Sequence, residues 1–239
     1  MEANIAAPAA LIADPTRAAM LSALLDGRAQ PAGALAWAAN VSAQAASNHL
    51  AKLTAGGLLK VETAGRHRYY RLASPEVAHA VEALACLAPP IRSLDEPRSP
   101  KARALRQARS CYGHLAGRLG VALTEALEAG GLIAQPEAGD DPRHFTLTEA
   151  GRRRLAELGL DAAALRPRPG LARRCLDWTE RRHHLAGPLG VALFARMVAL
   201  GWIEPARGGG RAVRLTAAGA EGLRALGLDP AGAGLAVAA

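Results

Sequence analysis

The sequence predicts a mainly α-helical protein with small β wings, in which a winged helix-turn-helix is followed by two repeated winged-helix-like modules. Hydrophobic residues make up 50% of the 239 residues and aromatic residues only 3%. Such a core consists of Leu, Ala and Val, which favours helices. Residues 14–72 have the pattern of three helices followed by a basic hairpin, and a ten-residue segment beyond residue 110 occurs twice.

Three helices are expected in the first sixty residues. Residues 14–27 begin with Asp-Pro, which starts a helix well, and end at glycine. Residues 31–40 form a short second helix. Ser42 caps a third helix that ends at the glycine pair 56–57, because glycine tolerates the left-handed conformation that follows a helix.

A hairpin and a fourth helix follow. The segments LLKVET and RYYRL alternate like two strands around a turn that contains Gly65. Residues 74–87 carry a serine cap, a proline in the first turn and apolar residues at helical spacing. The second and third helices are separated by a tight turn, so with the hairpin they form a helix-turn-helix followed by a wing.

The rest of the chain contains a linker and an internal repeat. Residues 88–101 hold four prolines and mixed charge, which is typical of a linker. The segment HLAGRLGVAL, 114–123, returns as HLAGPLGVAL, 184–193, and LTEAGRRRLAELGLD returns as LTAAGAEGLRALGLD. The predicted domains are a winged helix-turn-helix over 1–88, a linker over 89–102, module 1 over 103–165 and module 2 over 166–239.

Composition restricts the partners and the compartment. The formal net charge is +8 and the sequence pI about 10.2, which permits a polyanionic partner. Three scattered cysteines without a CxxC pair fit a reducing cytoplasm. There is no basic segment typical of a signal peptide at the start, and no charge-free apolar run of about 18 residues. We therefore expect a cytoplasmic protein that does not enter a membrane.

The first third of the chain resembles the ArsR family of winged helix-turn-helix transcriptional regulators. The segments DPTRAAMLSAL, SAQAASNHLAKLTAGGLL and AGRHRYYRL carry the resemblance, and the C-terminal region looks like an extension found in larger members. The resemblance implies a DNA-binding repressor that acts as a homodimer on palindromic double-stranded DNA. The apolar segments 10–25 and 75–87 are the candidate dimer surface.

One departure from the family pattern concerns metals. Metal-sensing members often carry a Cys-x-Cys pair at the start of the first helix of the helix-turn-helix, and here QPAGALAWAAN has neither cysteine nor histidine. His79 and Cys86 lie seven residues apart on the 74–87 helix without further ligands, and we interpret them as packing residues. No residue is assigned as a metal ligand.

The third helix and the hairpin tip are predicted to contact DNA. A recognition helix presents small and polar side chains to base edges, and Gln44 and Asn48, four residues apart, suit adenine. Hairpin tips of this kind reach phosphates or a minor groove. The alternative is a polar face and a basic turn that only water contacts. The predicted DNA-binding residues are Ser42, Gln44, Ala45, Ser47, Asn48, His49, Lys52, Arg66, His67 and Arg68.

The second half of the chain is expected to sense an effector that releases the protein from DNA. The sequence identifies neither the effector nor a cofactor. Cys111 and His114 are expected to share a face of one helix. The repeat places His114 opposite His184 but Cys111 opposite Arg181, so the cysteines are not expected to be equivalent. The candidate effector or redox residues are Cys111, His114, Cys175, Asp177, Trp178, Glu180, Arg181 and His184.

Four interpretations of these residues remain open. Under the first, a soft metal or haem would use Cys111, His114, Cys175 and a histidine. A thiol switch would pair Cys111 with Cys175. A small organic ligand would lie between the modules, close to Asp177 and its neighbours. Under the fourth interpretation, the cysteines and the tryptophan only pack in the core.

Three classes of function are compatible with a chain of this kind. A DNA-binding regulator is favoured over an enzyme on a winged-helix scaffold and over a module that binds only protein. The sequence has no P-loop, Rossmann fingerprint, HExxH or local serine-hydrolase motif, so we expect no enzymatic activity.

Overall fold

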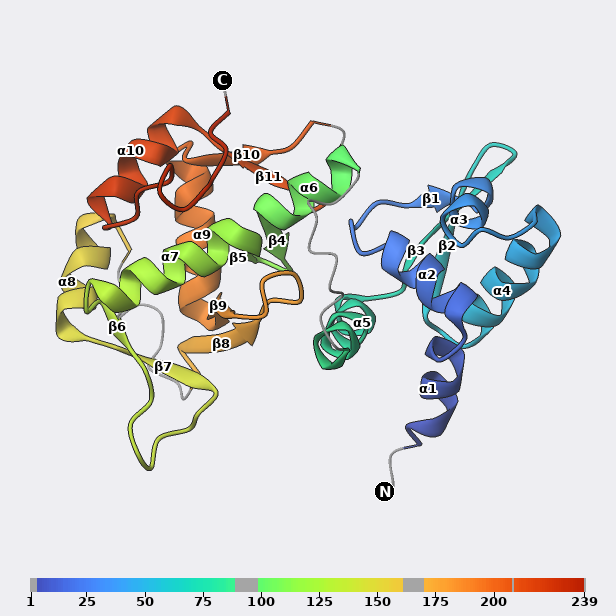
Figure 1. Ribbon diagram of the computed structural model, residues 1–239, viewed down its shortest axis with the longest axis horizontal. Coiled ribbons are helices and arrows are strands. Elements are labelled where there is room, and N and C mark those ends of the chain that lie inside the picture. Colours follow the sequence, from blue (N-terminus) through green and yellow to red (C-terminus); the bar gives the residue numbers. More distant parts are fainter. Residues whose placement is uncertain (1–3, 89–98, 161–169, 208, 239) are drawn as a thin grey trace. The chain divides into compact units, whose positions relative to one another are not determined.

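The computed structural model describes residues 4–88, 99–160, 170–207 and 209–238. The chain divides into two compact units, Met1–Ala88 and Pro89–Ala239, which we call the N-terminal unit and the C-terminal unit (Figure 1). Within the described ranges, no helix combines the length and the apolar character needed to cross a bilayer.

The N-terminal unit is a winged helix-turn-helix. Its helices are α1 (Ala6–Ile12), α2 (Pro15–Ala23), α3 (Ala32–Ala38), α4 (Ala43–Ala55) and α5 (Pro75–Leu87). Its strands are β1 (Gln30–Pro31), β2 (Leu59–Ala64) and β3 (His67–Leu72), which form an antiparallel sheet in the order β1-β3-β2. The predicted helices and hairpin are all present, and α1 is an additional helix that the sequence patterns did not indicate.

Local interactions fix the ends of these helices as the sequence predicts. The side chains of Asp14, Ser42 and Ser74 each accept a hydrogen bond from a backbone N–H in the first turn of α2, α4 and α5. Gly57 ends α4 with a φ of +74°, the conformation that glycine adopts without steric cost. The side chains that pack these helices together are fully buried and include Met20, Leu21, Leu35, Leu50 and Leu53.

The C-terminal unit mixes helices with short hairpins. The helices are α6 (Pro100–Gln107), α7 (Gly117–Ala129), α8 (Glu149–Glu157), α9 (Gly187–Ala199) and α10 (Ala217–Ala225). The strands are β4 (Arg109–Cys111), β5 (His114–Ala116), β6 (Ile133–Ala134), β7 (His144–Leu147), β8 (Ala172–Leu176), β9 (His183–Ala186), β10 (Ile203–Pro205) and β11 (Val213–Leu215).

Two expectations for this unit need correction. Cys111 and His114 do not share a helix, because they lie on β4 and β5, which are joined by a two-residue turn. Both turn residues, Tyr112 and Gly113, have positive φ, the conformation of tight hairpin turns. The helix α6, capped by Ser99, begins inside the predicted linker 89–102; residues 89–98 and 161–169 lie outside the described ranges.

The strands exchange partners between the two predicted modules. β7 of the first segment (103–165) pairs with β8 of the second segment (166–239), which gives a four-stranded sheet in the order β6-β7-β8-β9. In the other direction, Arg109 of β4 bridges to Ala212, beside β11. Backbone hydrogen bonds support that bridge, from Ser110 N to Arg211 O at 2.8 Å and from Val213 N to Ala108 O at 3.0 Å. The β8–β9 hairpin therefore extends the sheet of the first segment, and the β4–β5 hairpin makes one β-bridge beside β11 of the second segment.

The helices that follow the hairpins exchange partners in the same way. α7 packs on β9 and α9 packs on β5. Each helix also lies close to its own hairpin, because a Cβ added at Gly120 of α7 would lie 2.6 Å from Leu115 O of β5 and one added at Gly190 of α9 would lie 2.4 Å from Leu185 O of β9. One hydrophobic core contains residues of both segments, from Ala108 to Leu235. The segments 103–165 and 166–239 are thus parts of one compact unit.

This close approach makes Gly190 sensitive to substitution. Gly190→Ala should lower the free energy of unfolding by roughly 1–3 kcal/mol, because the added methyl group overpacks the contact with β9. This cost exceeds the stabilisation of about 1 kcal/mol that alanine gives a helix relative to glycine. Urea unfolding followed by circular dichroism measures the change. Gly33→Ala is the control, because a Cβ there meets no atom within 4 Å. An unchanged unfolding midpoint for Gly190→Ala would contradict the packing described.

Candidate functional site

The helix α4 presents a continuous polar face to solvent. Ala46, Leu50 and Leu53 point into the core of the N-terminal unit. The exposed residues between them form what we call the recognition face: Gln44, Ser47, Asn48 and Lys52. Gln44 Nε2 lies 3.5 Å from Asn48 Oδ1, so the two amides are neighbours on this face. Their position matches the expectation from their spacing.

Three other residues predicted to contact DNA from α4 have structural roles. The Ser42 hydroxyl accepts a hydrogen bond from Ala45 N at 3.2 Å, and Ala45 is half-buried. His49 Nδ1 lies 3.6 Å from Asp14 Oδ1, at the start of α2. The hydrogen bond from the Arg17 amide lowers the pKa of Asp14, which favours its charged form beside His49. His49 therefore lies where α4 meets the start of α2.

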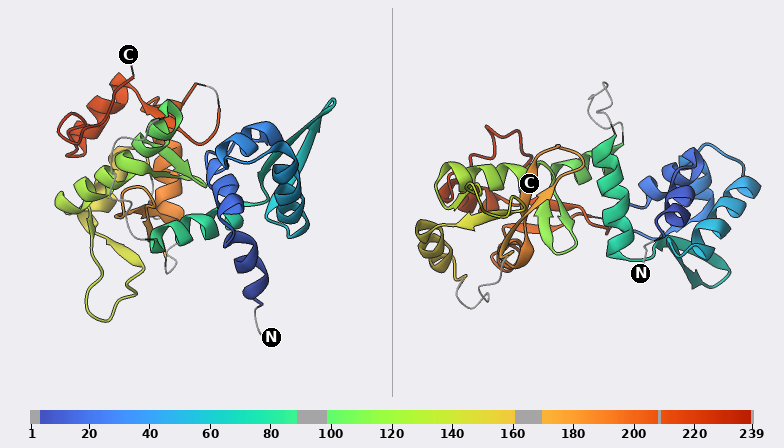
Figure 2. Two further views of the ribbon diagram at one scale, coloured as in Figure 1. Left: turned by 45° about the vertical axis from the view of Figure 1, so that its right-hand side comes forward. Right: turned by 90° about the horizontal axis from the view of Figure 1, so that it is seen from below.

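The predicted wing residues gather at the tip of the β2–β3 hairpin. Arg66, His67 and Arg68 are exposed, and Gly65 makes the turn with a φ of +58°. Figure 2 shows this hairpin extending from the body of the N-terminal unit. Tyr70 is buried and Tyr69 half-buried, because successive side chains of a strand point to opposite faces.

A buried cluster of two cysteines and two histidines lies in the C-terminal unit. We call Cys111, His114, Cys175 and His184 the Cys–His cluster; one ligand atom of each lies within 4.8 Å of every other. Cys111 pairs with His114 across the β4–β5 hairpin, and Cys175 pairs with His184 across the β8–β9 hairpin. The two cysteines thus occupy equivalent positions, and the expected alignment of Cys111 with Arg181 is wrong.

The two histidine rings face each other inside this cluster. His114 Nε2 lies 3.1 Å from His184 Nε2, and the ring centroids are 5.0 Å apart. Cys111, His114 and His184 are each at most 3% exposed, and Cys175 is half-buried. Two nitrogens at this distance need either a proton or a cation between them, because two lone pairs would repel.

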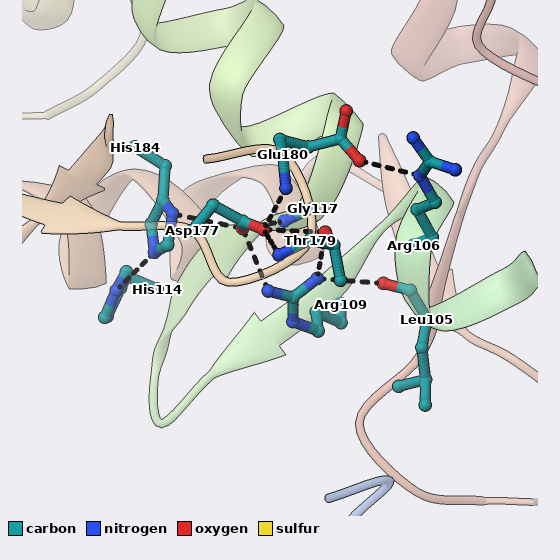
Figure 3. A network of polar contacts seen from close by, with 9 residues as sticks. All are labelled: Leu105, Arg106, Arg109, His114, Gly117, Asp177, Thr179, Glu180 and His184. Atoms are coloured by element: carbon teal, nitrogen blue, oxygen red, sulfur yellow. Dashed lines mark hydrogen bonds and ion pairs between the residues drawn. The ribbon is translucent and has the colours of Figure 1, made fainter. Parts of the chain in front are cut away.

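Beside the cluster, a fully buried carboxylate organises the β8–β9 loop (Figure 3). Asp177 Oδ2 accepts hydrogen bonds from Arg109 Nη2 at 2.9 Å and from Gly117 N at 2.7 Å. Its other oxygen, Oδ1, accepts from Thr179 N at 2.9 Å and from Thr179 Oγ1 at 2.7 Å. His184 Nδ1 lies 3.2 Å from Asp177 Oδ2, so this carboxylate orients one histidine of the cluster.

Burial and charge act in opposite directions on this pair. Burial raises the pKa of Asp177, but contacts with His184 and Arg109 lower it by more, so the carboxyl stays ionised. Burial lowers the pKa of His184, and the contacts with Asp177 and Cys111 raise it above its ordinary value. The arrangement holds a negative charge next to the Cys–His cluster.

The other predicted effector residues take part in contacts within the loop. Glu180 Oε1 lies 3.0 Å from Arg106 Nε, and the Arg109 guanidinium lies 5.0 Å from the centre of the Trp178 ring. Arg181 N donates to Asp177 O at 2.8 Å from a backbone with a φ of +57°. A cavity of about 210 Å³ lies elsewhere in the unit, lined by residues of α6, α7, β11 and 235–238, and includes none of the eight predicted effector residues.

The fold and the exposed recognition face define the class of protein: a winged helix-turn-helix that binds DNA. A family model described as a helix-turn-helix domain matches residues 12–62. The chain is 41% identical over 222 residues to YdfF of Bacillus subtilis, named an uncharacterized HTH-type transcriptional regulator, and the match covers 92% of this chain and 95% of that protein. The chain therefore belongs to the helix-turn-helix transcriptional regulators, and the resemblance noted in its sequence is confirmed.

Solved structures match the chain in part. A homodimeric winged helix-turn-helix DNA-binding domain from Mycobacterium bovis, described as a possible ArsR-family regulator, is 26% identical with a TM-score of 0.33, over 35% of this chain and 76% of that one. The cadmium sensor CMTR of Mycobacterium tuberculosis is 32% identical with a TM-score of 0.32, over 40% of this chain and 99% of that one. Scores at this level establish no shared fold over the whole chain.

Removing the charge of Asp177 should destabilise the C-terminal unit strongly. Asp177→Asn leaves the buried Arg109 guanidinium without its anion, which costs roughly 3–5 kcal/mol. Urea unfolding of the full chain measures the loss. Asp141→Asn, which removes an exposed partner of Arg143, is the matched control and should change the midpoint far less. Equal effects of the two substitutions would show that the buried pair has no special role.

Proposed function

We propose that the protein is a homodimeric repressor that binds a palindromic operator in double-stranded DNA in the cytoplasm and is released by an effector sensed in its C-terminal unit. The observation that carries the proposal is the recognition face of α4, which is exposed near a basic wing while Ala46, Leu50 and Leu53 hold the opposite face of the helix in the core. Such a face has the dimensions and chemistry of a major-groove reader.

On the recognition face, base reading is assigned to the two amides. Asparagine and glutamine pair with adenine through its N6 and N7 atoms, and Gln44 and Asn48 are exposed, adjacent and free of the core. Lys52 lies further along α4, where an ammonium suits a phosphate. Ser42, which also caps the helix, Ala45 and His49 are the remaining proposed contacts of α4 with DNA.

The wing supplies contacts that do not depend on the base sequence of the DNA. Arg66, His67 and Arg68 project from the tip of a hairpin without acidic neighbours in the turn. Guanidinium groups placed there hold phosphates or enter a minor groove. The wing thus provides affinity, and the recognition face provides specificity.

Dimer formation is supported by exposed apolar side chains. Ile5 and Leu87 are 75% and 81% exposed, and Leu84 of α5 is also exposed. These residues belong to or adjoin the terminal helices α1 and α5 of the N-terminal unit. Two copies joined through such helices present two recognition faces to a palindrome.

The C-terminal unit is proposed to be a duplicated, winged-helix-like sensor. Its support is the repeat HLAGRLGVAL and HLAGPLGVAL, and the matching order of hairpin, helix, hairpin and helix in the two segments. The Cys–His cluster lies between the repeats, where a bound or oxidised state would affect both. Oxidants, metals and small organic molecules are the effector classes to be screened for release of DNA.

Asn48→Ala should relax base preference at one operator position. Loss of a bidentate adenine contact costs roughly 1–3 kcal/mol at that position and little on other sequences. Operators are first selected from random duplexes with the wild-type protein, and titrations on single-base variants then locate the effect. An equal loss of affinity on every duplex would contradict a base-reading role.

Arg68→Ala should weaken binding to all duplexes alike. Removing one phosphate contact should reduce the slope of log affinity against log salt by about 1. Binding titrations at several salt concentrations measure the slope. Arg71→Ala is the matched control on the same strand, because Arg71 pairs with Glu62. A slope that stays unchanged in Arg68→Ala would exclude the phosphate contact.

A further inference from the structure

We propose that the Cys–His cluster is a binding site for one divalent metal ion of the zinc class. The ligands are the Sγ atoms of Cys111 and Cys175 and the Nε2 atoms of His114 and His184. The site is distinct from the DNA-binding surface, since every ligand belongs to the C-terminal unit. It would join the two hairpins that the segments exchange.

The distances fit a tetrahedral ion. Zinc bonds of about 2.0 Å to nitrogen and 2.3 Å to sulfur place two nitrogen ligands about 3.3 Å apart and two sulfur ligands about 3.8 Å apart. The two Nε2 atoms lie 3.1 Å apart, and all four ligand atoms lie within 4.8 Å of one another. These separations are close to those that a tetrahedral site requires.

The donor set selects the kind of metal. Thiolate and imidazole are preferred by zinc and its soft neighbours, whereas magnesium and calcium need oxygen ligands. The two thiolates balance the charge of a divalent ion, which makes its burial possible. Four protein ligands and burial describe a closed site that holds its ion as part of the structure.

The carboxylate beside the cluster prepares one ligand. A metal-bound histidine usually donates its second N–H to a carboxylate, which fixes its tautomer and orientation. His184 Nδ1 lies 3.2 Å from Asp177 Oδ2, so Nε2 is the atom left to face the cluster. Asp177 is itself held by Arg109 and by the Gly117 amide.

The arrangement of the ligands is symmetrical. Each hairpin contributes one cysteine and the histidine directly opposite it, and β5 lies against β9. Each histidine also rests on the helix of the other segment, because a Cβ at Gly120 would lie 3.6 Å from His184 Cβ and one at Gly190 would lie 3.4 Å from His114 Cβ. An ion at the centre would thus tie the two segments together.

The first test uses the full wild-type chain loaded with Zn²⁺ alone or Co²⁺ alone. We expect one ion per chain after dialysis, a tetrahedral thiolate spectrum for cobalt, and two sulfur ligands near about 2.3 Å with two nitrogen ligands near about 2.0 Å in X-ray absorption of the zinc form. A substoichiometric metal content or an oxygen-dominated ligand shell would overturn the proposal. This test needs no variant and does not depend on DNA binding.

The second test compares variants in the same full chain. Cys111→Ser and His184→Ala should lose the tetrahedral cobalt spectrum and the rise in melting temperature that Zn²⁺ gives the wild type. The matched controls Cys86→Ser and His183→Ala remove a cysteine and a neighbouring histidine outside the cluster and should keep both. Retention of the spectrum in Cys111→Ser or His184→Ala would overturn the proposed ligand set. The proposed repressor function is tested separately, by the DNA titrations described above.

Discussion

The C-terminal unit depends on an exchange of strand pairing between its two segments. The β8–β9 hairpin extends the sheet begun by β6 and β7, while the β4–β5 hairpin pairs beside β11. Neither segment buries its hairpin or completes its core without the other, because α7 packs on β9 and α9 on β5. The pairs are far apart in sequence, so most of the entropy of chain closure is lost before these contacts form. We infer that the two segments fold as one cooperative unit.

The Asp177–Arg109 ion pair is the main departure from symmetry. Eight residues separate Cys175 from His184, against two between Cys111 and His114, and Asp177 lies in the longer segment. Two charges buried from water usually cost as much as their attraction returns, so stability alone does not account for them. The contacts of Asp177 give a better reason for the buried pair. The carboxylate accepts hydrogen bonds from Thr179 in the loop and from Gly117 at the start of α7, and it lies 3.2 Å from His184 Nδ1. The pair therefore helps to define where the His184 ring points.

The sequence predicts the N-terminal unit well because its signals are local. Asp14, Ser42 and Ser74 cap helices, and Gly57 ends one, through contacts within a few residues. No local sequence pattern of this strength indicated the Cys–His cluster. Cys111 and His114 are spaced for a helix face and equally for a two-residue hairpin, and the positive φ of Tyr112 is rare outside glycine. The longer second loop shifts the repeat offset, which hid the equivalence of Cys111 and Cys175. The adjacent Tyr-Gly was the one available signal of a turn.

Much of the basic charge of the chain is neutralised by ion pairs within the C-terminal unit. Residues 91–239 contain 22 of the 29 Lys and Arg residues, which taken alone suggests a DNA-binding surface. Many of these side chains are already paired: Arg106 with Glu180, Arg109 with Asp177, Arg143 with Asp141, Arg154 with Glu157, Arg182 with Glu125 and Arg214 with Glu204. A guanidinium held by a carboxylate contributes little to the attraction of phosphate. Lys52 of α4 and Arg66 and Arg68 of the wing tip take part in none of these ion pairs. They are therefore better placed to bind DNA than the paired arginines of residues 91–239.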